Sequence, residues 1–131
     1  MYKLFLFSLF LFLGGCKEEY PTYASFEYQK KIPLSCLHYM ILDTKDKQVL
    51  KQALNIPDNP TCDTRVELTK YYVGKCNNPV VKSVGGDFNG YVRVEIKKSF
   101  KVYYKVQSDF KNDVDAAFNR VVKQLKIDLN Q

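Results

Sequence analysis

The sequence predicts an α+β fold, a two-layer sandwich in which two amphipathic helices cover one face of a mainly antiparallel sheet. Residues 91–97 and 100–107 each alternate apolar and polar side chains and are joined by a short polar turn, which is typical of a hairpin with one solvated face. Residues 44–55 and the segment from Asn112 onward repeat apolar residues at spacings of three and four, which is typical of helices. The predicted element order is therefore β-β-α-β-(β)-β-β-α.

The first half of the chain predicts two short strands and a helix. Residues 23–29 alternate rings with small or polar groups, as a strand does. The apolar run over residues 37–42 suits either a buried strand or the beginning of a helix. We favour the strand because Asp43-Thr44 then provides the N-cap of a helix that runs to about Asn55. One face of this helix carries its apolar side chains, Val49, Leu50, Ala53 and Leu54.

The second half predicts most of the sheet and its main covering helix. We expect a strand over residues 65–73, a short edge strand over residues 80–84 and a glycine-containing loop over residues 85–90. In the second strand of the hairpin, the inward side chains are expected to be Phe100, Val102, Tyr104 and Val106. The last helix carries a wide apolar stripe that must cover the sheet, formed by Val114, Ala117, Phe118, Val121, Val122, Leu125 and Leu129.

Composition and charge indicate one globular domain with a moderate positive charge. The 131 residues include 20 Lys or Arg and 14 Asp or Glu, which gives a formal net charge of +6 at pH 7. The basic residues alternate with acids and tyrosines, and no block of like charge occurs. Dispersed charge of this kind favours solubility and weak attraction to anionic surfaces. If the chain is exported, as its N-terminal segment indicates, the available anions are lipid head groups, lipopolysaccharide or a partner, and we expect no nucleic acid partner.

The N-terminal segment has the pattern of an export signal. One cation precedes a largely apolar run that Ser8 alone interrupts. A run of about 10 residues is too short to cross a bilayer core, which needs about 20 helical residues, but it suits a signal peptide. The four residues that end the segment, Leu13-Gly14-Gly15-Cys16, resemble the lipobox of bacterial lipoproteins.

This resemblance implies a lipid anchor at Cys16. The chain would be cut before Cys16, its sulfur would carry a diacylglycerol, and its new amine would carry an acyl chain such as palmitate. Residues 1–15 are then the signal peptide, residues 16–22 a lipid-anchored tether of at most about 20 Å, and residues 23–131 a single α+β domain. By the same resemblance, Lys17 stands where an aspartate retains some lipoproteins on the inner membrane. We therefore expect the outer membrane, with the domain facing the periplasm.

The remaining cysteines predict one disulfide and one leftover thiol. With Cys16 lipidated, Cys36, Cys62 and Cys76 remain in an oxidising compartment. A continuous strand over residues 65–73 spans about 30 Å, so the two cysteines that flank it cannot bridge. If this strand runs parallel to residues 37–42 across a helical crossover, Cys36 pairs with Cys62, and if it runs antiparallel, Cys36 pairs with Cys76. We favour Cys36–Cys62.

No group of residues in the sequence forms a known catalytic signature. His38 is the single histidine and lies in an apolar run, beside Ser35 and Cys36 but with no evident acid to orient it. The cysteines show neither paired spacing nor a histidine partner of the kind that zinc sites need. We therefore expect a protein that is not an enzyme, with no metal site and no cofactor other than the covalent lipid.

The outward face of the predicted hairpin is the best candidate binding surface. Rings and cations would gather there across two strands, where they could hold phosphate or sugar groups by charge and stacking. An ordinary solvated sheet face is the competing interpretation, because tyrosine and lysine are common on strands and sheet edges. The residues of the predicted cluster are Tyr91, Arg93, Lys101, Tyr103 and Lys105.

Together these features predict a membrane-anchored periplasmic lipoprotein that serves as a non-enzymatic accessory or adaptor in cell-envelope assembly. Its partner would be an envelope protein or an anionic glycolipid. Two alternatives remain open at this point. One is an interaction subunit of a secretion or surface complex, cross-linked through the leftover thiol, and the other is a surface-exposed adhesin.

Overall fold

A single five-stranded sheet and two helices make up the computed structural model, which describes residues 19–27, 33–73 and 88–129. The predicted short strand over residues 80–84 lies outside these residues. The elements in chain order are β1 (Thr22–Phe26), β2 (His38–Met40), α1 (Thr44–Leu54), β3 (Thr64–Tyr72), β4 (Gly90–Lys98), β5 (Lys101–Phe110) and α3 (Val114–Leu129).

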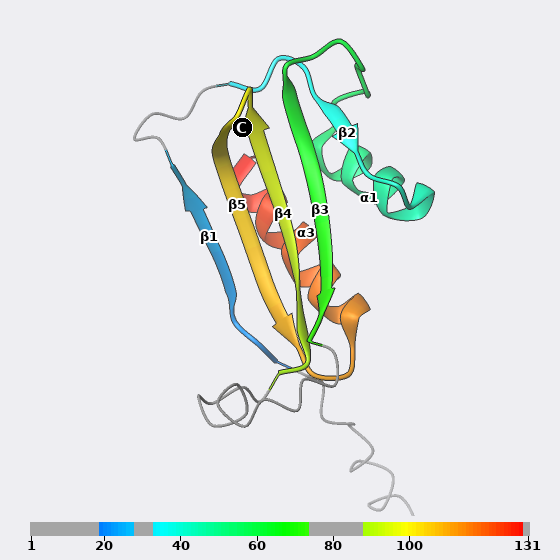
Figure 1. The fold of residues 1–131 in the computed structure, drawn as a ribbon, viewed down its shortest axis with the longest axis vertical. Helices are drawn as coiled ribbons and strands as arrows, with labels where there is room; N and C mark the ends of the chain where they lie inside the picture. Colours follow the sequence, from blue (N-terminus) through cyan, green and yellow to red (C-terminus); the bar gives the residue numbers. More distant parts are fainter. Residues whose placement is uncertain (1–18, 28–32, 74–87, 130–131) are drawn as a thin grey trace, which may run out of the picture.

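The sheet is mixed, with one parallel pair at one end. The strand order is β1-β5-β4-β3-β2, and Figure 1 shows β1 and β2 at opposite margins. The pairs β1–β5, β5–β4 and β4–β3 are antiparallel, whereas β2 and β3 are parallel. A parallel pair needs a crossover, and α1 lies in the connection between β2 and β3. The predicted combination of a mainly antiparallel sheet with two helices is thus confirmed.

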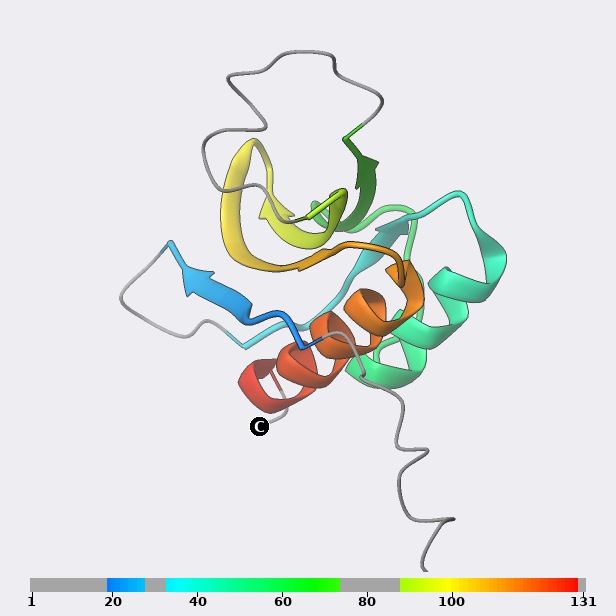
Figure 2. The same cartoon turned by 90° about the horizontal axis from the view of Figure 1, so that it is seen from below.

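The core lies between the sheet and the helices. Both helices lie on the same side of the sheet in Figure 2. The alternation predicted for β4 is confirmed, because Val92, Val94 and Ile96 are fully buried. They belong to the same apolar cluster as Val121 and Leu125 of α3. Each fully buried aliphatic side chain of this kind stabilises the fold by about 1.5–3 kcal/mol.

Both helices begin at aspartate caps. The Asp43 side chain accepts the backbone N–H of Asp46 at 2.9 Å, and this bond lowers the pKa of Asp43. At the start of α3, Oδ1 of Asp113 accepts the N–H of Ala116 at 2.9 Å. The predicted beginnings of both helices are therefore confirmed. One detail of the first helix is wrong, because Val49 is 38% exposed and lies at the margin of the apolar face.

Two side chains of α3, those of Asp128 and Arg120, fasten the helix to the sheet by hydrogen bonds. The Tyr104 hydroxyl donates to Oδ2 of Asp128 at 2.7 Å, and burial is the main cause that raises the pKa of this tyrosine far above its ordinary value. Arg120 Nε donates to the fully buried Ser108 hydroxyl at 2.9 Å, and Arg120 Nη2 donates to the carbonyl of Asp109 at 2.8 Å. These bonds hold the helix in one register along β5.

The hairpin between β4 and β5 contains a bulge that the sequence pattern did not predict. Ile96 pairs with Tyr104 but Lys97 pairs with Val102, which leaves Tyr103 as an extra residue. Because a bulge interrupts the alternation of faces, Tyr103 and Tyr104 are both buried. Phe100, expected to point inward, lies in the turn and is 96% exposed, next to Ser99 with a φ of 55°. The predicted inward positions are thus wrong for Phe100 and for Val102, which pairs with Lys97 on the face away from the core. The predicted outward position is wrong for Tyr103.

Candidate functional site

The face of the sheet opposite the helices, here called the open face, carries a network of charges. The positions that alternate with the buried ones place Arg93, Glu95 and Lys97 of β4 on this face, beside Glu67 of β3. Lys97 Nζ lies 2.7 Å from Oε2 of Glu67, and Arg93 Nε donates to Oε1 of Gln107 at 2.9 Å. The charged side chains are 18–32% exposed. Cations and acids here compensate each other, so the open face has no concentrated positive charge.

One end of the open face is aromatic. The rings of Tyr71 and Tyr91 stack with centroids 5.3 Å apart and an interplanar angle of 26°. The guanidinium carbon of Arg93 lies 4.7 Å from the centroid of the Tyr91 ring, which is within cation–π distance. Tyr71 remains 50% exposed, so part of the stack is available to a flat or extended partner.

The structure brings together three of the five residues predicted for the binding surface. Tyr91, Arg93 and Lys105 occupy the open face, where Lys105 pairs with Glu95. Lys101 lies instead opposite Lys98, next to the hairpin turn, and Tyr103 is 4% exposed. The predicted five-residue cluster is therefore wrong for Lys101 and Tyr103. The physical reason is the bulge, which reverses the face of the sheet that successive β5 side chains occupy between Val102 and Tyr104.

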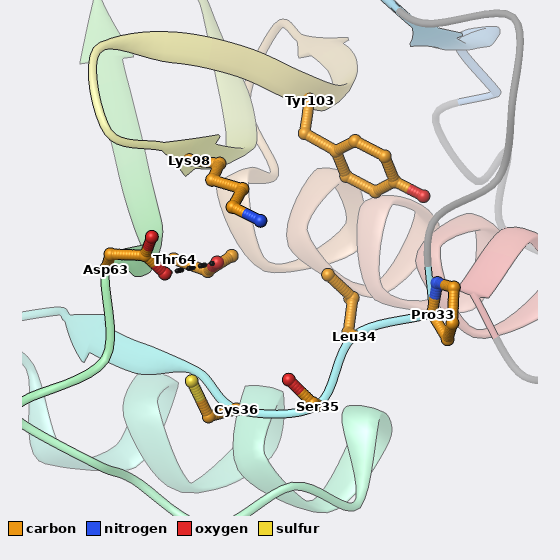
Figure 3. A pocket seen from close by; sticks show the side chains of 8 residues that line it. All are labelled: Pro33, Leu34, Ser35, Cys36, Asp63, Thr64, Lys98 and Tyr103. Carbon is orange, nitrogen blue, oxygen red and sulfur yellow. Dashed lines mark hydrogen bonds between the residues drawn. The ribbon is translucent and has the colours of Figure 1, made fainter.

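The predicted disulfide is confirmed and borders a small pocket. Cys36 and Cys62 are bonded with Cα atoms 6.0 Å apart, as the parallel arrangement of β2 and β3 predicts. Figure 3 shows the pocket beside Cys36, with Lys98 and Tyr103 reaching in from the hairpin and Leu34 from the opposite side. Its volume is about 70 Å³, and a water molecule occupies about 30 Å³ in the liquid. The pocket has room for a few waters and not for a substrate of ordinary size.

A second polar cluster, absent from the sequence-based candidates, lies at the β2 margin. Nδ1 of His38 is 3.0 Å from Oδ1 of Asp58, and Lys47 Nζ is 2.7 Å from Oδ2 of the same carboxylate. The backbone N–H of Tyr39 also donates to Oδ1 of Asp58, at 3.0 Å. Asp58 reaches these groups because its own backbone forms a parallel bridge with Leu37. His38 thus has an orienting acid, contrary to the sequence-based expectation.

The electrostatics of this cluster favour a structural carboxylate. The hydrogen bond from Lys47 is the main cause that holds the pKa of Asp58 well below its usual range, against partial burial, and the bonds from His38 and Tyr39 act in the same direction. Burial, followed by the negative charge of Asp58, raises the pKa of Tyr39 to about 12. The Tyr39 hydroxyl donates to the carbonyl of Ile56 at 2.7 Å. These contacts hold the segment after α1 against β2.

A catalytic role for His38 would need a nearby nucleophile, and the thiol of Cys36, its neighbour in the sequence, is not available for that role. Cys36 is oxidised in the disulfide, and a disulfide sulfur is not a thiolate nucleophile. Asp58 was missed because 20 residues separate it from His38. One feature could have indicated this contact. In a parallel crossover, the chain after the helix comes back to the beginning of the first strand, so the turn Pro57-Asp58-Asn59-Pro60 would be expected near the beginning of β2.

Several sequence-based candidates lie outside the described residues. These are Cys16 with the rest of the lipobox-like segment, and Cys76. Within residues 19–27, 33–73 and 88–129, no three His, Cys, Asp or Glu side chains gather closely enough to hold a metal ion. In the same part of the chain, no helix combines the length and apolar character needed to cross a membrane.

Comparisons with models of protein families, with curated protein sequences and with solved structures find no match to this chain. The residues and their geometry therefore carry the functional proposal.

Proposed function

We propose that this chain is a lipoprotein, anchored through Cys16, that acts as a non-enzymatic accessory or adaptor in cell-envelope assembly. The observation that carries the proposal is the segment that ends in Leu13-Gly14-Gly15-Cys16 after one cation and a short apolar run. In this proposal the mature protein has no cofactor besides its lipid. It resides at the outer membrane and faces the periplasm.

The Cys36–Cys62 bond supports an exported location. Structural disulfides form and persist in oxidising compartments and are rare in the reducing cytosol. The bond joins residues 26 positions apart and lies at the margin of the sheet, where it constrains the α1 crossover. A chain carrying both an export signal and such a bond fits the periplasm or the cell surface.

The position of β1 supports action close to the membrane. β1 begins at Thr22, so the tether after Cys16 is only a few residues long. At about 3.4 Å per residue it extends to about 20 Å. In this proposal the two-layer arrangement, with helices on one face, leaves the open face of the anchored domain to meet a partner.

The charge pattern favours an envelope protein over an anionic glycolipid as that partner. Arg93 and Lys97 already contact Gln107 and Glu67 on the open face, so an anion would have to displace these contacts. The exposed ring of Tyr71 and the alternating charges beside it suit a protein surface of mixed polarity.

Metabolic labelling of the full chain with an alkyne analogue of palmitate tests the anchor directly. We expect a labelled mature protein that partitions into the detergent phase, and loss of both properties in Cys16→Ser with accumulation of the larger precursor. Cys76→Ser is the matched control and should label normally. An unlabelled wild type, or label that persists in Cys16→Ser, contradicts the proposal.

A second candidate function follows from the disulfide pairing. Because Cys36 and Cys62 pair with each other, Cys76 has no partner among the other mature cysteines once Cys16 is lipidated. An interaction subunit of a secretion or surface complex could use this thiol to cross-link a neighbouring protein. A mixed disulfide on a non-reducing gel that disappears in Cys76→Ser would favour this subunit over the adaptor. Degradation by protease added to intact cells would instead favour a surface adhesin.

A further inference from the structure

Within Thr22–Phe26, the margin of the sheet formed by β1 lacks the charges, prolines and bulges that often keep a sheet edge from pairing with another chain. Within the part of the chain that the structure describes, β5 is its only strand neighbour, and Figure 1 shows the other side of β1 at the outer limit of the sheet. The strand is TYASF, with no charged residue, no proline and no register shift against β5. Natural sheet edges are normally protected by such features.

The pairing with β5 determines which backbone groups of β1 point outward. The N–H of Glu27 donates to the carbonyl of Tyr103 at 3.1 Å, so Glu27 directs its backbone polar groups towards β5. In an antiparallel pair this direction alternates along the strand. Tyr23 and Ser25 therefore also bond towards β5, whereas the N–H and C=O of Thr22 and Ala24 point to the outer side.

From this pattern we infer that β1 is a dimerisation edge, at which two copies of this chain pair in antiparallel fashion with Ala24 opposite Ala24. The two Ala24 residues then exchange a pair of N–H···O=C bonds across a two-fold axis. Thr22 of each copy lies opposite Phe26 of the other, and the two sheets join into one. This mode of pairing is strand addition at an exposed edge, in a symmetric form.

The side chains of β1 complement themselves in this register. On the open face, Tyr23 lies opposite Ser25 of the second copy, so the 59% exposed ring meets a small side chain. At the ends of the pairing, Glu27 lies opposite Pro21, and no two like charges face each other within the strand. The uncharged side chains of Thr22–Phe26 allow the two backbones to approach to ladder distance along the strand.

Lys105 adds a charge contact across the same interface. It pairs with Ser25 in its own sheet, so it lies two strand spacings, about 10 Å, from Tyr23 of the second copy. A lysine side chain and a tyrosine ring together span this distance and form a cation–π contact. Two such contacts occur in the dimer by symmetry, which favours a second copy of this chain over an unrelated strand.

Site-specific cross-linking of the full chain in total cell extract tests the register. In a Cys76→Ser background, Ala24→Cys places two cysteines opposite each other with Cα atoms about 5.5 Å apart, within the range of a disulfide. Thr22→Cys is the matched control, because the two Thr22 positions lie about 14 Å apart along the strands. Under mild oxidation we expect a covalent dimer from Ala24→Cys, and none from Thr22→Cys or from the parent.

Two non-cysteine variants test the dimer without cross-linking. Ala24→Pro removes an outward N–H, and Tyr23→Lys places a cation near Lys105 of the second copy. Both variants should raise the dissociation constant of the dimer at least tenfold and leave the monomer folded. Light scattering of the detergent-solubilised full chain, corrected for detergent, measures the mass, and circular dichroism reports folding. Monomeric wild type, unchanged dimer mass in Ala24→Pro, or cross-linking of Thr22→Cys but not Ala24→Cys overturns the inference. A mixed disulfide of Ala24→Cys with a different protein overturns it as well.

Discussion

The two margins of the sheet are built in opposite ways. At the β2 margin, the outward N–H of Tyr39 donates to the Asp58 carboxylate, and the carbonyl of Leu37 accepts the N–H of Asn59 at 2.8 Å. The Cys36–Cys62 bond fastens the same region covalently. At the β1 margin, a neutral strand of five residues directs backbone groups outward, with an exposed tyrosine beside them.

This difference shows how one chain can close one edge of its sheet with its own residues and leave the other edge to pair with a partner. A capped edge satisfies its backbone groups within the chain, so its stability is independent of concentration. An uncapped edge leaves its pairing to a partner, whose binding stabilises the folded state only by mass action. The capped margin is assembled from residues 36–62 around a short crossover, whereas β1 joins the sheet through β5, about 80 positions later in the chain. Substitutions at the two margins should therefore have unequal effects.

The largest effect is expected from removal of the disulfide at the β2 margin. The double substitution of Cys36 and Cys62 by alanine should lower the free energy of unfolding by about 3–4 kcal/mol, because the bond closes a loop with a sequence separation of 26. Urea unfolding followed by circular dichroism measures the change. Cys76→Ala is the control and should have a small effect. A loss below about 1 kcal/mol would show that the margin is held by its hydrogen bonds alone.

The second largest effect is expected from Asp58→Asn. The substitution removes the ion pair with Lys47 and the charge that strengthens the bonds from His38 and the Tyr39 N–H, for a loss of about 2 kcal/mol at pH 7. Asp115→Asn, at an exposed position, is the matched control. It should change the free energy of unfolding by only a few tenths of a kcal/mol.

The effect of Asp58→Asn should also depend on pH with a defined sign. The pKa of Asp58 is lowered in the folded protein, so its charged form contributes stability above the unfolded value of about 4 and this contribution is lost as the pH falls below it. The difference between wild type and Asp58→Asn should thus be full at pH 7 and shrink towards pH 2. A difference that stays constant from pH 7 to pH 2 contradicts the assigned role of the carboxylate.

A smaller effect is expected from proline substitutions at adjacent positions of β1. Ser25→Pro removes an N–H that bonds to β5 and should lower the free energy of unfolding by about 1–2 kcal/mol. Ala24→Pro removes an outward N–H and should change the stability of the monomer by less than half as much. The measurement is urea unfolding at a protein concentration low enough to keep the chain monomeric. Equal losses would show that the assignment of inward and outward groups in β1 is wrong.

The smallest effect is expected from the loss of single tyrosine hydroxyls at the two margins. Tyr39→Phe deletes the 2.7 Å hydrogen bond to the carbonyl of Ile56 and should lower the free energy of unfolding by about 1 kcal/mol. Tyr23→Phe deletes a hydroxyl from a side chain that is 59% exposed and should change stability by less than about 0.5 kcal/mol. Thermal unfolding of the monomeric protein compares the two. A larger loss for Tyr23→Phe would reverse the proposed contrast between the margins.

The elements that could be predicted are those whose causes lie within a few residues. The Asp43 cap, the apolar stripe of the last helix and the buried Val92, Val94 and Ile96 all follow from local spacing. The Cys36–Cys62 pair was favoured because one topological alternative placed both residues at neighbouring strand starts.

The candidate sites were harder to predict because their residues meet through pairings between distant segments. The bulge at Tyr103 leaves no periodic signal in the sequence, yet it removes Lys101 and Tyr103 from the predicted surface. Asp58 lies beside His38 because its backbone forms a parallel bridge with Leu37, and in the sequence the loop that contains Asp58 has the pattern of an ordinary turn. Neither the register of a strand nor the return path of a loop is determined by composition.

The sequence by itself therefore determined the type of most elements, the apolar face of β4 and, apart from Val49, those of the helices. It also showed an N-terminal segment with a lipobox-like end. These depend on hydrophobic period, capping and short motifs, which act over a few neighbouring residues. Only the tertiary structure decided that β1 and β2 form the two margins and that the Asp58 carboxylate caps the backbone at the β2 margin. It also decided that a bulge turns Tyr103 inward. Those outcomes depend on which distant segments pack together, because packing and backbone pairing across the whole sheet select among registers that the local pattern leaves equivalent.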